Sequence, residues 1–457
     1  MTRLRESILA LTVLIAAWGL LALPAGMSHD QRMTFAIMLV TLALWGTGLV
    51  PGYVASTFLF ASLILTGAAE PAEVFSSFSS SAIWLVVTGF VIGAAISHSG
   101  LGKRLGALAQ PHLSRSYPAL IAGLMLLGMA LGFVMPSSLG RAAVLVPVGM
   151  ALADTLGLSK GSAGRTGVAI IIAIGTNMPS FAILPSNIPN VILSGVAEKT
   201  FGTHFSYGHY LLLHYPVLGL LKSAVIVLLV LKLFPAQIVK NETANQQTQT
   251  GGLRQAALMV VLLITLALWS TDQWHGINPA WIGLGASLLL MIPQLGFVPP
   301  PVFRSSVDFS MLLFVAGALT LGTIVSSSGL GALIASKVFG VLPFSQGHDF
   351  LNFMSLSLLA TVTSIFTTMA GVPAVLTPLT PDLAQATGFS QEAVMMTQVI
   401  GFSSVLFPYQ VGPLIVAMGL AGESTRPLLK VTLSLFVITV LALIPLDFLW
   451  WRLLGVI

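Results

Sequence analysis

Apolar stretches recur along the whole chain, and many come close to the ~20 residues that a helix needs to cross the hydrocarbon core of a bilayer. Hydrophobic residues make up 56% of the sequence and charged residues 7%, whereas soluble domains carry about 25% charged residues. The stretches lack the alternation over about ten residues that marks the strands of an outer-membrane barrel. The predicted spans are residues 8–23, 33–50, 52–67, 83–96, 211–234, 253–269, 280–292, 309–325 and 428–451. The sequence therefore predicts an all-α polytopic membrane protein with about 11 transmembrane helices.

The first apolar stretch follows Arg3 and Arg5, a pattern shared by secretory signal peptides and first transmembrane helices. Leu21-Ala22-Leu23-Pro24-Ala25 is a poor cleavage site, and another span follows at once. We therefore interpret residues 8–23 as the first transmembrane helix, with a cleaved signal peptide as the alternative.

Several function classes are excluded by composition. The excess of basic over acidic residues lies in short loops, where it orients the protein in the membrane and forms no nucleic-acid patch. There is no cysteine, so disulfides, thiolate metal sites and cysteine nucleophiles are excluded. The spans contain no His-Glu-x-x-His or paired aspartate motif, so we expect neither an enzyme nor an organic cofactor.

Two apolar passages are interrupted by residues that a lipid-facing helix does not tolerate. Met135-Pro136-Ser137-Ser138-Leu139-Gly140-Arg141 breaks the passage 119–153, and Phe366-Thr367-Thr368-Met369-Ala370-Gly371-Val372-Pro373 breaks a passage in the second half. Non-helical backbone at membrane depth persists only where it is buried in protein or lines an aqueous cavity. Paired interruptions of this kind point to the binding site of a secondary transporter. We predict two re-entrant hairpins, at residues 118–156 and 352–388.

Two further passages contain several prolines and cannot form single regular helices. Pro179, Pro185 and Pro189 interrupt residues 167–197, and Pro408 and Pro413 interrupt residues 392–420. The sequence thus predicts one broken helix in each half of the chain.

The two halves are related by an internal repeat. Ile96-Ser97-His98-Ser99-Gly100-Leu101-Gly102 aligns with Val325-Ser326-Ser327-Ser328-Gly329-Leu330-Gly331, and Gly157-Leu158-Ser159 aligns with Gly388-Phe389-Ser390. Threading the chain from a cytoplasmic N-terminus places most basic residues on the cytoplasmic side and brings the hairpins in from opposite sides, so the repeats are predicted to be inverted. The predicted plan has scaffold helices (1–81), repeat one (82–234), a polar cytoplasmic linker (235–252), further scaffold helices (253–308) and repeat two (309–457).

Several of these stretches resemble a known family of carriers. Ile83-Trp84-Leu85-Val86-Val87-Thr88-Gly89-Phe90-Val91-Ile92-Gly93, Ser99-Gly100-Leu101-Gly102-Lys103-Arg104 and Val307-Asp308-Phe309-Ser310-Met311-Leu312-Leu313-Phe314 are similar to helices of the divalent anion–sodium symporter family, in the ion transporter superfamily. Its members carry dicarboxylates, citrate or sulfate. The resemblance covers nearly the whole chain. It implies a homodimer in a bacterial inner membrane, elevator-type alternating access, and hairpin tips that bind substrate and flank two sodium sites.

The chain departs from that family at the tips. Family hairpins carry Ser-Asn-Thr at a fixed distance before a proline, but here Ser137-Ser138-Leu139 and Thr368-Met369-Ala370 stand there. Both asparagines are missing. In the broken helices, Pro189-Asn190 and Pro408-Tyr409-Gln410 match parts of the family patterns.

The candidate site residues come from the tips and the broken helices. Hydroxyls and unwound N–H groups suit an anion, whereas unwound carbonyls and amide oxygens suit a cation. Thr367 and Thr368 mirror the first tip in the repeat. The candidate substrate-binding residues are Ser137, Ser138, Arg141, Asn190, Thr367, Thr368, Tyr409 and Gln410. The candidate ligands of a coupling Na⁺ are Ser137, Thr176, Asn187 and Thr368.

Arg141 is the least expected residue of the first hairpin, because a charge at membrane depth costs at least ~3 kcal/mol. It could pair with an acidic residue, reach a cytoplasmic cavity, or contact an anionic substrate with its planar fork. We favour the substrate contact and add the hypothesis that the guanidinium replaces the charge of a lost sodium ion. Lys222, also within a span, is expected to reach the interface or to be paired, and Asp308 to cap a helix.

The sequence thus predicts a secondary active transporter of small anions, with dicarboxylates favoured over sulfate. Sodium is the coupling ion by analogy with the family. A proton-coupled carrier, a sodium-independent anion exchanger and an anion channel are the alternatives. The expected partners are a small anion, membrane lipid and a second copy of the chain.

Overall fold

The computed structural model describes residues 7–14, 16, 27–238, 252–339, 342 and 344–457. Within these residues the chain forms helices and connecting turns, and no strand occurs. Half of the predicted first helix (8–23) and most of the predicted linker (235–252) lie outside the described residues, so their assignments stay predictions.

The described part of the chain confirms an all-α membrane protein. Seven of its helical segments are long and apolar enough to cross a bilayer: Ser81–Ser99, Tyr117–Val134, Tyr207–Leu233, Leu253–Ser270, Phe309–Ser327, Asp349–Thr367 and Arg426–Leu453. Gly52–Leu65 and Pro279–Met291 are shorter apolar helices.

The same series of elements occurs in both halves of the chain. A long helix (α5, Ser81–Ser99; α17, Phe309–Ser327) is followed by a shorter one (α6, Leu101–Leu113; α18, Leu330–Phe339). Next come two helices joined by a short break. These are α7 (Tyr117–Val134) and α8 (Ser138–Thr155) in the first half, and α19 (Asp349–Thr367) and α20 (Gly371–Leu376) in the second. In the second half η5 (Thr377–Leu379) and α21 (Thr380–Thr387) continue from α20. The breaks fall inside the two predicted hairpins.

The predicted broken helices are present, and their prolines lie in or next to the breaks. The first consists of α9 (Ala163–Gly175), η2 (Met178–Ala182), η3 (Leu184–Ser186) and α10 (Ile188–Phe201). The second consists of α22 (Gln391–Phe402), η6 (Pro408–Gln410) and α23 (Gly412–Leu420). Each half then closes with a long helix that contains a π-helical segment. In the first half this helix consists of α11 (Tyr207–His214), the π-helical η4 (Tyr215–Leu221) and α12 (Lys222–Leu233). In the second half it consists of α24 (Arg426–Ile438), the π-helical η7 (Thr439–Leu443) and α25 (Ile444–Leu453). Pro216 and Pro445 lie at these segments, where a missing N–H disturbs the regular ladder.

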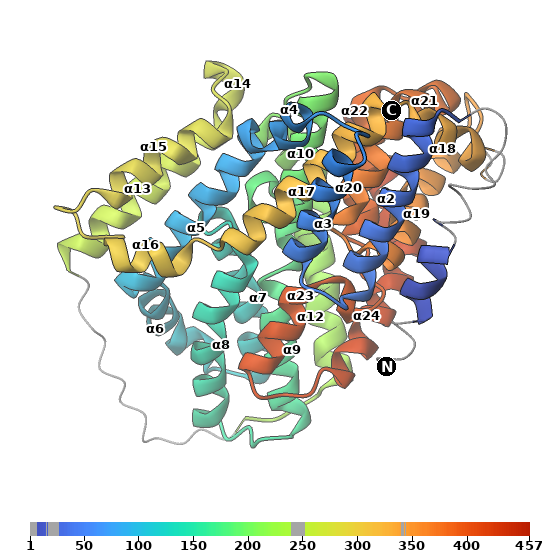
Figure 1. Ribbon diagram of the computed structural model, residues 1–457. Helices are drawn as coiled ribbons and strands as arrows, with labels where there is room; N and C mark the ends of the chain where they lie inside the picture. Colours follow the sequence, from blue (N-terminus) through green and yellow to red (C-terminus); the bar gives the residue numbers. More distant parts are fainter. Residues whose placement is uncertain (1–6, 15, 17–26, 239–251, 340–341, 343) are drawn as a thin grey trace.

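The leading helices of each half pack on the other half. α3 (Gly52–Leu65), beside α2 (His29–Thr47), packs on α17, whereas α15 (Pro279–Met291), beside α13 (Leu253–Ser270), packs on α5. Figure 1 shows α13 and α15 at one side of the molecule and α2 and α18 toward the other. Both contacts are close: a Cβ at Gly317 would lie 2.4 Å from Ser56 Oγ, and one at Gly283 would lie 2.8 Å from Thr88 Oγ1.

The second arms of the broken helices also cross between the halves. α10 packs on α17 and α20, whereas α23 packs on α8 and α9. The first arms, α9 and α22, lie in the core: Val168 to Ile174 and Ala393 to Phe402 are all buried. This crossing brings helix ends from both halves to one place in the interior.

Candidate functional site

The first hairpin turns at residues 135–137, which we call the first tip. α7 ends at Val134, and Met135 follows in an extended conformation. Ser137 then caps α8, since its Oγ accepts a hydrogen bond from Gly140 N at 3.1 Å. The tip lies against α5 at Gly89, where an added Cβ would come 3.0 Å from Pro136 Cβ. The hydroxyl at the start of α8 is therefore built into the turn.

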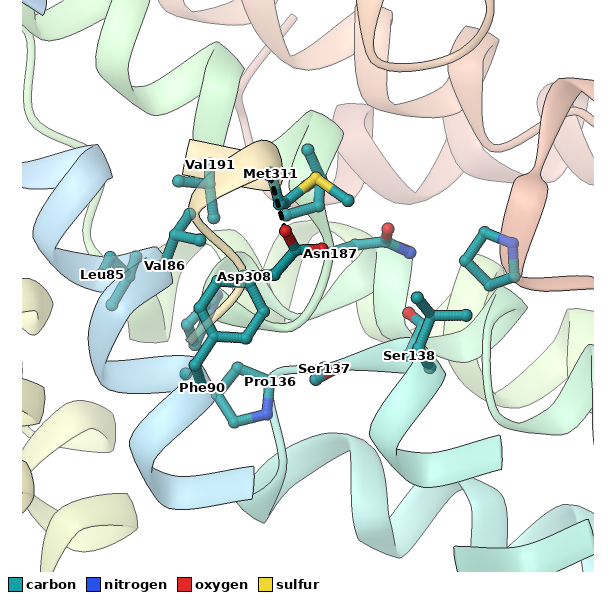
Figure 2. A pocket seen from close by; sticks show the side chains of 15 residues that line it. Leu85, Val86, Phe90, Pro136, Ser137, Ser138, Asn187, Val191, Asp308 and Met311 are labelled. Carbon is teal, nitrogen blue, oxygen red and sulfur yellow. Dashed lines mark hydrogen bonds between the residues drawn. The ribbon is translucent and has the colours of Figure 1, made fainter. Parts of the chain in front are cut away.

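A pocket that opens to solvent lies at the first tip (Figure 2). Its volume is about 620 Å³ when the part open to solvent is included. Its polar side chains belong to Ser137, Ser138, Asn187 and Asp308. The remaining lining residues are Leu85, Val86, Gly89, Phe90, Pro136, Leu139, Pro185, Ile188, Val191, Met311 and Pro413. Of the predicted residues, the structure thus brings Ser137, Ser138 and Asn187 together.

Four helices begin at this pocket. Ser138 is the first residue of α8, and Ile188 is the first residue of α10. Asp308 is the N-cap of α17, and Pro413 stands in the first turn of α23. A helix N-terminus carries unpaired N–H groups and about half a positive elementary charge. The pocket therefore combines the positive ends of helices from both halves of the chain.

Asp308 was expected only as a helix cap, and that expectation is confirmed: its Oδ1 accepts a hydrogen bond from Met311 N at 3.2 Å. Its position in the pocket was not predicted. Figure 2 shows the carboxylate near Asn187, across from Pro136 and Ser137. A carboxylate thus shares a pocket that is otherwise suited to anions. The sequence offered only its place at the start of a span as a signal.

Arg141 is fully buried and contacts Ser138, one of the residues that line the pocket. Its Nε donates to Thr176 O at 2.8 Å, its Nη1 donates to Met135 O, and its Nη2 donates to Ser138 Oγ at 2.9 Å and to Ser186 O at 3.2 Å. Among the described residues no ion pair involves Arg141. The guanidinium therefore joins the first tip to the first broken helix, and it is not among the residues that line the pocket. Its predicted contact with substrate stays a prediction.

The predicted residues of the first broken helix are buried. Thr176 Oγ1 donates to Ile172 O at 2.8 Å within α9, and Asn187 Nδ2 donates to Ser180 Oγ at 3.0 Å. Asn190 Nδ2 donates to Phe181 O at 3.0 Å and Ile183 O at 2.9 Å, which holds the turns between η2 and α10. Only Asn187 of these predicted residues also lines the pocket.

The second hairpin turns at residues 368–370, which we call the second tip. Thr368 adopts φ 66° and ψ 168°, and it is the one non-glycine residue with positive φ among the described residues. Thr367 is buried, and its Oγ1 donates to Thr363 O at 2.9 Å. The pocket at the first tip takes no lining residue from the second tip.

Tyr409 and Gln410 bind the second broken helix to α19. Tyr409 is exposed, and its hydroxyl donates to Ile365 O at 3.1 Å. Gln410 is buried, and its Oε1 accepts hydrogen bonds from Leu406 N at 2.9 Å and Phe407 N at 2.7 Å. Both residues therefore brace the fold around the second tip.

Lys222 has a hydrogen-bond partner inside the protein. It is buried, and its Nζ donates to Ser403 O at 2.7 Å, at the end of α22. Asp447 of α25, also fully buried, is close enough to interact electrostatically with Lys222. A lysine inside an apolar span was the signal for this contact, but its partner in the other half was not predictable from spacing.

The helical fold, the paired breaks and the pocket between helix ends of both halves define a membrane transporter. A family model described as the sodium:sulfate symporter transmembrane region matches residues 2–457, and the chain belongs to this family. The expected family membership is thereby confirmed.

Similar proteins are bacterial membrane proteins. The chain is 23% identical to a membrane protein of Cupriavidus necator (94% of this chain, 89% of that protein) and 23% identical to the inner membrane protein YbhI of Escherichia coli K12 (95% of each). It is 21% identical to the L-tartrate/succinate antiporter of Escherichia coli K12 (89% of each). The fold resembles the crystal structure of the Alcanivorax borkumensis YdaH transporter, with a TM-score of 0.58, 15% identity and coverage of 94% of this chain and 99% of that one.

Proposed function

We propose that this chain is a secondary active transporter that exchanges small dicarboxylate anions through the pocket at the first tip. The observation that carries the proposal is the convergence of the N-termini of α8, α10, α17 and α23 on that pocket. Helix N-termini stabilise anions in low-dielectric surroundings, and broken helices use them for this purpose at transporter midplanes.

The side chains of the pocket support the same substrate class. Ser137 and Ser138 place hydroxyls at the start of α8, and Asn187 adds an amide at the start of α10. The relative named as an L-tartrate/succinate antiporter supports a dicarboxylate and an exchange reaction, whereas the family description makes sulfate the competing anion.

The packing around the pocket supports an alternating-access movement between two groups of helices. α5 and α17, which pack on α15 and α3, provide one wall. The ends of α8, α10 and α23 provide the other walls. We propose that the second group slides against the first in an elevator-type movement. The homodimer implied by the resemblance stays a prediction.

Counterflow in proteoliposomes tests the proposed reaction. Vesicles loaded with unlabelled succinate, tartrate or sulfate receive labelled succinate outside, with sodium replaced by choline in a parallel set. We expect saturable uptake that requires an internal dicarboxylate and persists in choline. Uptake that needs no internal anion and does not saturate would indicate a channel, and uptake supported only by sulfate would contradict the substrate class.

The movement can be tested because the chain contains no cysteine. A single cysteine at Ser138 would report access to the pocket through a membrane-impermeant thiol reagent. We expect labelling from both sides of the membrane and slower labelling with saturating succinate. The control is a cysteine at Ser305, an exposed residue of α16 (Pro300–Ser306) outside the pocket, whose labelling should not respond to succinate.

A further inference from the structure

A buried cation of the protein itself contacts the carbonyl end of the first arm in each broken helix. Arg141 Nε lies 2.8 Å from the carbonyl oxygen of Thr176, and Lys222 Nζ lies 2.7 Å from the carbonyl oxygen of Ser403. Thr176 is the C-cap of α9, and Ser403 is the C-cap of α22. The two contacts therefore occupy equivalent places in the two halves, although α8 supplies one cation and α12 supplies the other.

The surroundings of the two C-caps also correspond. The hydroxyl of each C-cap residue donates back into its own helix, from Thr176 to Ile172 O at 2.8 Å and from Ser403 to Ile400 O at 3.1 Å. At the second site Lys222 Nζ also lies 3.5 Å from Ser403 Oγ, a longer contact than the 2.7 Å to the carbonyl oxygen. Both helices are buried in the core, so water cannot solvate this negative helix end.

At the first site the Arg141 guanidinium also donates hydrogen bonds to carbonyls at the ends of two other helical segments. Met135 is the C-cap of α7, and Ser186 is the last residue of η3. The carbonyls of Met135 and Ser186 accept hydrogen bonds from Arg141 together with that of Thr176. A hydroxyl oxygen, Ser138 Oγ, completes the set at 2.9 Å. A single positive charge thus sits where the carbonyl ends of two helices and a turn converge.

Converging carbonyl and hydroxyl oxygens are the ligands that hard cations prefer, and unwound carbonyls coordinate Na⁺ in broken-helix transporters. Here the carbonyls that would hold a sodium ion next to α9 and α22 already accept hydrogen bonds from fixed ammonium and guanidinium groups. The residues present at these two helix ends therefore do not fit a bound sodium ion.

We propose that Arg141 and Lys222 are built-in counter-cations that take the place of bound sodium at the ends of α9 and α22. The consequence is a carrier whose broken helices stay assembled without an alkali cation. This proposal rests on the proposed function only in treating the protein as a carrier, because the contacts of Arg141 and Lys222 with the carbonyls are independent of the substrate.

Thermal unfolding of the purified protein without substrate tests the proposal separately from transport. The wild-type melting temperature should be the same in sodium, potassium and choline chloride at equal ionic strength. A saturable rise in sodium alone would overturn the proposal, and so would loss of dicarboxylate counterflow in choline. Failure of counterflow in every salt would instead reject the dicarboxylate function and leave the melting result valid.

Removal of either cation should create a sodium dependence. Arg141→Ala and Lys222→Ala each free a carbonyl that a small cation can reach, so we expect both variants to melt several degrees higher in sodium than in choline. Arg32→Ala is the matched control, since Arg32 Nε also donates to a backbone carbonyl, that of Met27 at 3.2 Å, but at a partly exposed position. Variants as indifferent to sodium as this control would contradict the proposal. If the alanine variants fail to fold, the wild-type melting temperatures in sodium, potassium and choline chloride still test the proposal.

Discussion

Gln410 Nε2 donates a hydrogen bond to Ser364 Oγ at 2.7 Å, which ties the break of the second broken helix to the last turns of α19. The other end of the same amide accepts hydrogen bonds from Leu406 N and Phe407 N. The resemblance to known carriers suggested Gln410 as a substrate ligand. In the structure its side chain has three hydrogen-bond partners within the protein, and its contact with substrate stays a prediction.

We therefore expect Gln410→Ala to destabilise the protein without a specific effect on substrate selectivity. The substitution removes the acceptor of the partly buried N–H groups of Leu406 and Phe407, whereas the Ser364 hydroxyl keeps its bond to Thr361 O. An N–H group left unsatisfied costs about 1–3 kcal/mol when it is buried. The melting temperature should fall by several degrees. Thermal unfolding in detergent measures the loss, and Gln273→Ala, at an exposed position of α14 (Asp272–His275), serves as the control. An unchanged melting temperature with lost succinate binding would restore Gln410 to the binding site.

Prolines, glycines and hydrophobic periodicity predicted much of the fold because their effects are local. Pro136, Pro185 and Pro408 remove backbone donors wherever they stand, so the breaks fall inside the predicted passages. The repeat was readable from short matching stretches such as those around Gly100 and Gly329, and both glycines end a helix with positive φ.

The site was harder to predict because it depends on which helix ends meet across the two halves. Sequence spacing placed Ser137 and Asn187 near breaks, but it could not show that the starts of α17 and α23 reach the same pocket. Sequence spacing also could not predict that Arg141 binds the C-cap carbonyl of α9, because every residue has a backbone carbonyl and the sequence does not distinguish one from another.

Ser137→Ala should weaken the binding of succinate about 10- to 100-fold, because a hydrogen bond to a charged group contributes about 1.5–3 kcal/mol. The substitution also removes the cap of α8, at about 1 kcal/mol. Ser390→Ala separates the two effects. Ser390 caps α22 with the same geometry, its Oγ accepting from Ala393 N at 3.1 Å, but it does not line the pocket. Isothermal titration should show weaker binding for the first variant alone, and equal losses in both would assign the effect to capping.

Asp308→Asn should tighten the binding of dianions about 3- to 10-fold, because the carboxylate repels a second negative charge in the same pocket. Asparagine is as good an N-cap as aspartate, so the bond to Met311 N and the start of α17 are kept. Competition binding with succinate and sulfate at low ionic strength measures the change. Asp30→Asn, in the first turn of α2 and outside the pocket, is the control. Weaker binding of both anions would show that Asp308 contributes a favourable contact, such as acceptance of a substrate proton.

Thr368→Gly should stabilise the protein by about 1 kcal/mol, because φ 66° with ψ 168° lies in a region that only glycine adopts without strain. Glycine loses more backbone entropy on folding, by roughly 0.5–1 kcal/mol, so the gain is smaller than the strain itself. Thr368→Ala keeps the strain and removes the same hydroxyl. Only the glycine variant should therefore melt higher than the wild type. If Thr368 is a ligand, as its position in the repeat predicts, both variants should lose succinate affinity equally. Unchanged affinity in both would leave backbone geometry as the role of Thr368 in the turn.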